Sequence, residues 1–229
     1  MPVLRQLPRW AWPGMAVLAL IAGWINAAGY LGFRHQSISN MTGNTSLLGI
    51  ALGKGDAGEV LHWALTIAAF VLGSMLSGVI VQQSTLRLGR RYGVALLLES
   101  LLLFAAVPLL DAADSSGLYL ASAAVGLQNG MVSAYSGMVI RTTHVTGIFT
   151  DMGIYLGHLL RGLPVDRLRL RVCVLVAACF MLGSAIGALL FERMQDHSLL
   201  VPAALTGVCG LAYGLYCLFS PAAGDAGGG

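Results

Sequence analysis

Long apolar runs, separated by short polar segments, dominate the chain. Five of these runs contain no Asp, Glu, Lys or Arg, and a sixth, 92–110, contains only Glu99. A bilayer core about 30 Å thick needs about 20 apolar residues in a helix. We therefore predict six membrane-spanning helices, at 10–33, 60–86, 92–110, 115–140, 172–191 and 197–224.

Two further segments, 35–53 and 145–160, are too short or too polar for this scheme. The first is apolar only from Leu47 to Leu52, and the second is interrupted by Asp151 and His158. A helix over 43–52 would be roughly 15 Å long at 1.5 Å per residue, about half of a bilayer. We predict that each segment forms a half-helix.

Composition supports a lipid bilayer as the environment of the chain. Hydrophobic residues make up 57% of the 229 residues and charged residues 10%, whereas soluble domains carry about 25% charged residues. The net charge of +3 is scattered, which argues against a nucleic-acid partner. The four cysteines lie in apolar runs without a C-x-x-C pair, so we expect buried thiols rather than a metal site or disulfides.

The distribution of Lys and Arg favours six crossings over eight. If all eight segments crossed, the two sides would carry 7 and 6 basic residues. If the two short segments dip in and return, the side of the N-terminus carries 10 and the other side carries Arg34, Lys54 and Arg193. By the positive-inside rule, both termini are then expected on the cytoplasmic side of a bacterial inner membrane.

The chain also contains an internal repeat. AGWINAAGY at 22–30 matches VGLQNGMVS at 125–133, SNMTGNTSLLG at 39–49 matches THVTGIFTDMG at 143–153, and FVLGSMLSG at 70–78 matches FMLGSAIGA at 180–188. The order of the blocks is the same in both halves. Small residues four apart, such as Gly23 with Ala27 and Gly183 with Gly187, predict close helix packing in each half.

With three crossings per unit, the second copy is inverted relative to the first. The predicted fold class is an all-α polytopic membrane helix bundle, a single transmembrane domain over 1–229 with a tail at 221–229. It consists of two inverted repeats, about 12–110 and 115–219, each with three spans plus one half-helix. Inverted repeats with interrupted helices are typical of transporters and channels.

The two Thr-Gly segments carry a family resemblance. SNMTGNTSLLG in the first half and QNGMVSAYSGMVIRTTHVTGIFTDMG in the second resemble the YoaK-like family, bacterial multispan membrane proteins with a domain of unknown function. The similarity covers roughly residues 12–219. The resemblance implies a six-span integral membrane protein and a candidate transporter, but no established substrate or mechanism.

The half-helices provide the first candidate site. Thr42 and Thr146 each precede a Gly and an apolar run, so we predict that they cap the helix N-termini. A helix N-terminus at mid-membrane presents free N–H groups that attract an anion or a carbonyl oxygen, unless neighbouring side chains satisfy them. The candidate substrate-binding residues of this region are Asn40, Thr42, Gly43, Asn44, Thr143, Thr146 and Gly147.

At three aligned positions near the half-helices, only the second half has ionisable groups. Arg141, His144 and Asp151 stand where the first half has Ser37, Asn40 and Leu47. Asp151 is a candidate for solute binding or ion coupling, with Arg141 or His144 as its expected partner; the alternative is a static ion pair. His144 is a candidate proton relay or a simple hydrogen-bond donor.

Polar residues within the spans form the second group of candidates. Glu99 is a candidate ion-coupling residue or interior partner if it is buried, and an interfacial residue if it is shallow. Asn26, Gln128 and Asn129 lie in the middle of the paired first spans, where amides line a cavity or bond between helices.

No nucleotide-binding, hydrolase or metalloprotease motif occurs, so we expect no enzyme activity, cofactor or metal. The preferred function is a secondary transporter or channel for a small polar or anionic solute. The alternatives are a scaffold or sensor with a partner membrane protein, and an intramembrane enzyme that uses Asp151 and His144. The solute, the coupling ion and a possible homo-oligomer stay open.

Overall fold

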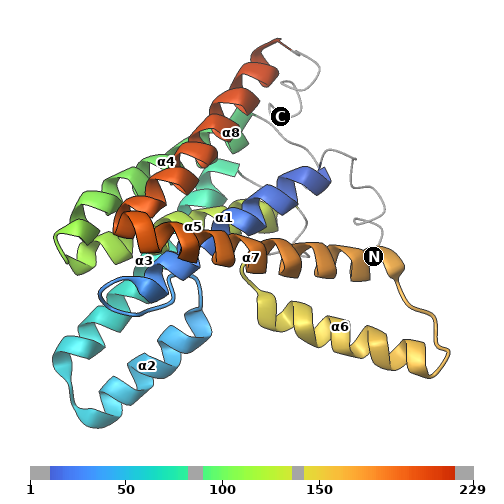
Figure 1. Cartoon of the computed structure of the whole chain (residues 1–229), viewed down its shortest axis with the longest axis horizontal. Coiled ribbons are helices and arrows are strands. Elements are labelled where there is room, and N and C mark those ends of the chain that lie inside the picture. Colours follow the sequence, from blue (N-terminus) through green and yellow to red (C-terminus); the bar gives the residue numbers. More distant parts are fainter. Residues whose placement is uncertain (1–10, 82–89, 136–141, 220–229) are drawn as a thin grey trace.

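The protein is a bundle of α-helices (Figure 1). The computed structural model describes residues 11–81, 90–135 and 142–219. The helices are α1 (Ala11–Leu31), α2 (Met41–Lys54), α3 (Ala57–Val81), α4 (Arg90–Asp111), α5 (Ser115–Tyr135), α6 (Val145–Leu160), α7 (Arg167–Met194), the 3-10 helix η2 (Gln195–Leu199) and α8 (Leu200–Phe219). Each predicted span and half-helix therefore corresponds to one helix.

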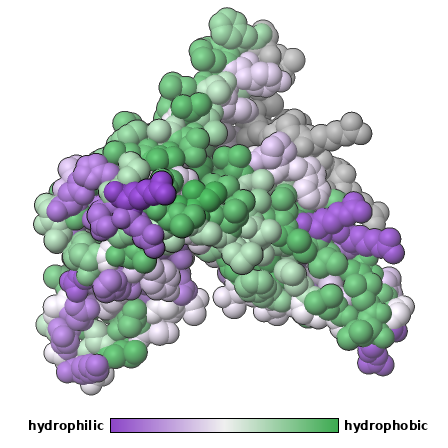
Figure 2. Space-filling view, viewed as in Figure 1, coloured by the Kyte–Doolittle hydropathy of each residue, from purple (hydrophilic) through white to green (hydrophobic). Residues whose placement is uncertain are grey.

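Apolar side chains cover much of the outer surface, as expected for a protein that lies in lipid. Met181 on α7 exposes 71% of its surface and Val208 on α8 exposes 63%, and green apolar residues extend over most of the face shown in Figure 2. Within the described residues, four segments are long and apolar enough to cross a membrane: Trp12–Leu31, Ala57–Val81, Arg91–Asp111 and Arg167–Phe219, the last of which contains both α7 and α8. The membrane helix bundle is thus confirmed.

Helix α5 differs from these segments because it is much more polar. It is 21 residues long, and Ser122 and Gln128 are completely buried in its centre. It packs against α3 and α4, so its polar side chains contact protein rather than lipid. Its start is fixed by Asp114, whose pKa is held below its ordinary value by hydrogen bonds from the N–H and the hydroxyl of Ser116.

Two tight helix crossings form the centre of the bundle, and both depend on glycine. In the crossing of α1 with α7, Gly23 lies against the main chain of Phe180, and Gly183 lies against that of Leu20. A Cβ at either glycine would overlap a carbonyl oxygen of the partner helix. These contacts confirm the close packing that the small residues predict.

The crossing of α3 with α5 repeats the same arrangement. Gly126 lies against the main chain of Phe70, and Gly73 against that of Ala123. One serine bond accompanies each crossing: Ser74 Oγ donates to Gly126 O at 2.9 Å, and Ser184 Oγ donates to Gly23 O at 3.0 Å. The sequence blocks pair Gly23 with Gly126 and Ser74 with Ser184. Residues aligned by the internal repeat therefore make equivalent contacts.

Helices α2 and α6 are short and lie beside their successors. Each turns back to form a hairpin, α2 with α3 and α6 with α7, and the two hairpins extend to opposite sides of the view (Figure 1). With 14 and 16 residues, the two helices are about 21 and 24 Å long, less than the hydrocarbon core of about 30 Å. Gly55, with a φ of 68°, ends α2 and makes its tight turn possible.

Candidate functional site: the central cleft

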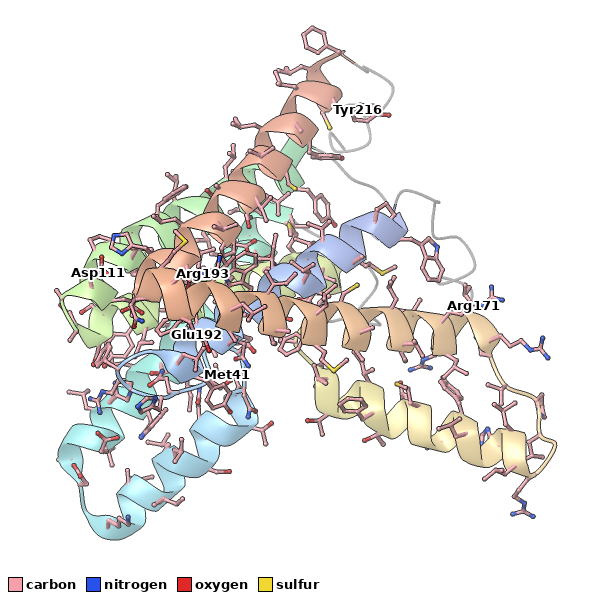
Figure 3. All side chains as sticks on the ribbon, viewed as in Figure 1. Met41, Asp111, Arg171, Glu192, Arg193 and Tyr216 are labelled. Carbon is pink, nitrogen blue, oxygen red and sulfur yellow. The ribbon has the colours of Figure 1, made fainter. Side chains whose placement is uncertain are left out.

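A cleft of about 700 Å³, here called the central cleft, lies where the N-termini of α2 and α6 approach each other. Figure 2 shows the surface hollowed between the two hairpins, and Met41 at the start of α2 points to the middle of the molecule (Figure 3). The central cleft is lined by Asn26, Tyr30, Ser37, Ser39, Asn40, Met41, Thr42, Phe70, Ser74, Asn129, Gly130, Ser133, Thr143, His144, Val145, Thr146 and Phe180.

One wall of the central cleft is organised by Asn26 of α1. Its Oδ1 accepts hydrogen bonds from Ser37 Oγ at 2.5 Å and from Ser39 Oγ at 2.9 Å, and also from the N–H of Ser39 at 3.1 Å. The amide of Asn44 donates to the carbonyl of Ser37 at 3.2 Å. The loop before α2 is thereby fixed to the centre of α1, which sets the position of the α2 N-terminus.

The opposite wall uses Asn129 of α5 in the same way. Its Oδ1 accepts from Thr143 Oγ1 at 3.0 Å and from Thr142 Oγ1 at 3.4 Å. The repeat aligns Asn129 with Asn26 and Thr143 with Ser39. Each helix N-terminus at the central cleft is therefore held by an asparagine from the preceding long helix.

The caps of α2 and α6 differ from the prediction. Thr42 and Thr146 are the second residues of their helices, so the prediction that they are N-caps was wrong. Asn40 caps α2, because its Oδ1 accepts from the N–H of Gly43 at 3.2 Å. His144 occupies the cap position of α6 but makes no such bond; its ring instead lies over Gly147.

This difference leaves the N-terminus of α6 the more available of the two. The first N–H groups of a helix have no partner within the helix, and in α6 the imidazole of His144 accepts no cap hydrogen bond from them. Both helix ends carry partial positive charge. Among the described residues that line the central cleft, none is Asp, Glu, Lys or Arg. The described walls are therefore polar and carry none of these four charged side chains.

Comparison with known proteins agrees with this membrane architecture. Residues 14–212 match the family described as "Protein of unknown function (DUF1275)". The chain belongs to this family. A 67-residue segment is 34% identical to the "UPF0700 transmembrane protein YoaK" of Bacillus subtilis (strain 168), and covers 29% of this chain and 30% of that relative. The matched segment thus spans less than a third of the relative's length. No solved structure matches the chain.

The position of Asp151 in this DUF1275 protein corrects a second prediction. Its Oδ2 lies 3.3 Å from Arg169 Nη2 at the start of α7, so its ion-pair partner among the described residues is Arg169 and not His144. Arg141 itself lies outside the described residues. Both members of the pair are about one-third exposed, and Asp151 does not line the central cleft. The pair joins α6 to α7 and is partly exposed, so it differs from the alternative as well, in which a buried pair fixes the loop to its helix.

Glu99 is an interior residue rather than an interfacial one. Its side chain is fully buried between α4 and α5, where Gln128 Nε2 donates to Glu99 Oε1 at 3.0 Å. Thr142 Oγ1 donates to Gln128 Oε1 at 3.1 Å. Gln128 therefore lies behind the central cleft and connects Glu99 to the loop that precedes α6.

Apart from Arg141, which lies outside the described residues, the predicted candidates fall into two groups. Those that line the central cleft are Asn26, Asn40, Thr42, Asn129, Thr143, His144 and Thr146, and those that do not are Gly43, Asn44, Glu99, Gln128, Gly147 and Asp151. The sequence reasoning missed Phe70 and Phe180, which the repeat aligns with each other and which line the central cleft together with Ser74 and Ser133. Their shared position in the repeat was the available signal.

Proposed function

We propose that this protein is a secondary transporter or channel of the bacterial inner membrane for a small polar or anionic solute, which binds in the central cleft. The observation that carries this proposal is the presence of both short-helix N-termini, Met41–Thr42 and Val145–Thr146, on one cleft. Two partially positive helix ends favour an anion or a carbonyl oxygen between them.

The size and lining of the central cleft support a small solute. Its volume of about 700 Å³ lies within the range of small-molecule sites, about 300–1,000 Å³. Hydroxyl and amide side chains from α1, α5 and both loops provide donors and acceptors, and Phe70 and Phe180 provide apolar surface. The absence of carboxylates from its described lining favours a neutral or negatively charged solute over a cation.

Equivalent contacts in the two halves support an inverted repeat. The Gly23–Phe180 and Gly126–Phe70 contacts, with their serine bonds, relate α1 and α7 to α5 and α3. Two halves of opposite orientation provide two related arrangements of one fold, in which the central cleft opens first to one side of the membrane and then to the other. No chemical step is needed, so we propose no enzyme activity.

Flux through reconstituted protein tests this function. Proteoliposomes are exposed to gradients of chloride, formate, glycerol or urea, and the volume change is followed by light scattering. We expect at least one of these probes to pass faster than through protein-free vesicles. Thr146→Trp should then reduce that rate about tenfold, an increase of about 1.4 kcal/mol in the barrier, because the indole takes up part of the central cleft beside the α6 N-terminus.

The matched control is Thr150→Trp. Thr150 is also exposed and lies one turn further along α6, away from the central cleft. Thr150→Trp should leave the flux rate unchanged. Equal rates for both variants would show that the solute does not pass between the helix ends, and the absence of flux for all four probes would argue against a route for small solutes.

A further inference from the structure

The buried carboxyl of Glu99 is unusual in its surroundings. It lies within the span Arg91–Asp111 and exposes none of its surface. One oxygen accepts a single hydrogen bond from Gln128, and Oε2 has no partner among the described residues. An ionised carboxylate at such a site would carry an uncompensated charge in a low-dielectric interior, which costs far more than burial of the neutral acid.

The groups around Glu99 provide no counter-charge. Besides Arg91, Tyr92 and Asp111 of α4 itself, the described titratable side chains on the packed elements are Cys209, Tyr213, Tyr216 and Cys217 of α8, Tyr119 of α5, Glu59 and His62 of α3, and Asp196 and His197 of η2. Of these, Cys209 is the electrostatic neighbour of Glu99, and a thiol supplies no positive charge. Within the described part of the chain, no Lys, Arg or His forms an ion pair with Glu99. His62 instead bonds to Gln36 and Tyr119.

A continuous chain of hydrogen bonds joins this carboxyl to the central cleft. Gln128 donates to Glu99 and accepts from Thr142 Oγ1 at 3.1 Å. The single hydroxyl proton of Thr142 is shared with Oδ1 of Asn129, at 3.4 Å, and Asn129 lines the central cleft. The first half has no equivalent chain, because the repeat aligns Thr142 with Ile38. The connection is therefore specific to the loop that positions α6.

We propose that Glu99 is a proton-binding site whose occupancy is coupled to the central cleft through Gln128 and Thr142. This inference rests on the proposed function, since it makes that transporter proton-coupled. One proton binds to Oε2 and gives a neutral acid, while Oε1 keeps the bond from Gln128. Loss of that proton converts the bond to a stronger, charge-assisted one and draws Gln128 toward Glu99. Thr142 and the start of α6 then move with Gln128. By thermodynamic linkage, if proton binding at Glu99 changes the affinity of the central cleft for its solute, solute binding changes the proton affinity of Glu99 by the same factor.

Infrared spectroscopy of the reconstituted protein tests the proton site without any solute. At about pH 7, carboxyls of ordinary pKa are ionised. The difference spectrum between wild type and Glu99→Gln should contain the C=O band of a protonated acid. The appearance of carboxylate bands in their place would overturn the proposal. Glu59→Gln and Asp196→Asn are the controls, and neither should remove the band, because Glu59 is half-exposed and paired with Arg34, and Asp196 lies outside the α4–α5 interface.

Two further variants test the coupling and keep Glu99 in place. Gln128→Leu removes the donor and should shift the C=O band to higher frequency. Thr142→Val should cause a smaller shift in the same direction, because it acts through Gln128. An unchanged band in Gln128→Leu would overturn the neutral-acid geometry, and an unchanged band in Thr142→Val would overturn the link to the cleft.

Transport separates this inference from the proposed function. A pH gradient should drive flux of the active probe in wild type, whereas Glu99→Gln should carry the probe down its own gradient only. If wild-type flux ignores the pH gradient, the coupling fails while transport stands. If no probe passes although the acid band is present, the proposed function fails and Glu99 remains a buried, protonated acid.

Discussion

At the scale of single residues, four glycines determine how closely the long helices approach. Gly23 and Gly183 face the main chain of the partner helix in one crossing, and Gly73 and Gly126 do so in the other. Close packing of this kind replaces the hydrophobic effect, which is weak between helices in lipid. The serine bonds to Gly23 and Gly126 depend on the same short separation.

Alanine at these positions should therefore destabilise the fold. A Cβ at Gly23 or Gly126 overlaps a carbonyl group, which cannot move without separating the helices. We expect Gly23→Ala and Gly126→Ala each to lower the free energy of unfolding by about 1–3 kcal/mol. Thermal unfolding in detergent, followed by circular dichroism, measures the effect.

Gly49 and Gly78 provide matched controls on α2 and α3. A Cβ at either residue meets nothing within 4 Å, and alanine is the better helix former by about 1 kcal/mol. Gly78→Ala should therefore be neutral or stabilising. Similar losses of stability in all of these variants would mean that close approach is not the function of the glycines.

At the scale of elements, the two short helices differ at their first turns. Asn40 satisfies the N–H of Gly43 in α2, whereas His144 satisfies no N–H of α6 through its side chain. The same position in the repeat therefore stabilises one helix end and leaves the other open. We therefore expect α6, rather than α2, to respond to a solute bound in the central cleft.

Amide exchange should reveal this difference. Asn40→Ala removes a cap worth about 1 kcal/mol, which corresponds to about fivefold faster exchange in the first turn of α2. His144→Ala should leave exchange in the first turn of α6 unchanged, since no cap bond is lost. Hydrogen–deuterium exchange with mass spectrometry resolves both segments. Faster exchange at α6 in His144→Ala would contradict the open-end description.

The sequence predicted the helices better than their ends or their partners. Uninterrupted apolar runs defined α1, α3, α7 and α8, because few other structures satisfy the backbone in lipid. The caps were misplaced by two residues, since Asn40 and Thr42 are both ordinary capping types. The Asp151–Arg169 pair could not be predicted, because it depends on how α6 folds back on α7.

At the scale of the whole molecule, the α2–α3 and α6–α7 hairpins extend to opposite sides of the view (Figure 1), and the N-termini of α2 and α6 line the central cleft. The turn between α2 and α3 follows Lys54, whereas the turn between α6 and α7 lies among Arg161, Arg167, Arg169 and Arg171. Arg171 lies near the far end of α7, away from the centre (Figure 3). From the positive-inside rule we predict that the arginine-rich turn lies in the cytoplasm and the other turn outside.

Cysteine labelling tests this topology. In intact cells, a membrane-impermeant maleimide should react with Gly53→Cys and fail to react with Leu163→Cys, and the opposite should hold in inverted vesicles. Both positions are exposed at the hairpin turns. The wild type, whose four cysteines are buried or half-buried, gives the blank. Reaction of both variants from the same side would contradict the inverted arrangement.

The partners of the central crossings also determine how this chain can be made. Helix α1 packs on α7, and α3 packs on α5, so each tight interface joins an early segment to one from the second half. Neither half contains a complete interface of this kind. In a nascent chain that has inserted only its first four helices, the glycine-containing surfaces of α1 and α3 have no partner helix yet. Such a chain must be protected from degradation until synthesis of α7 completes the structure.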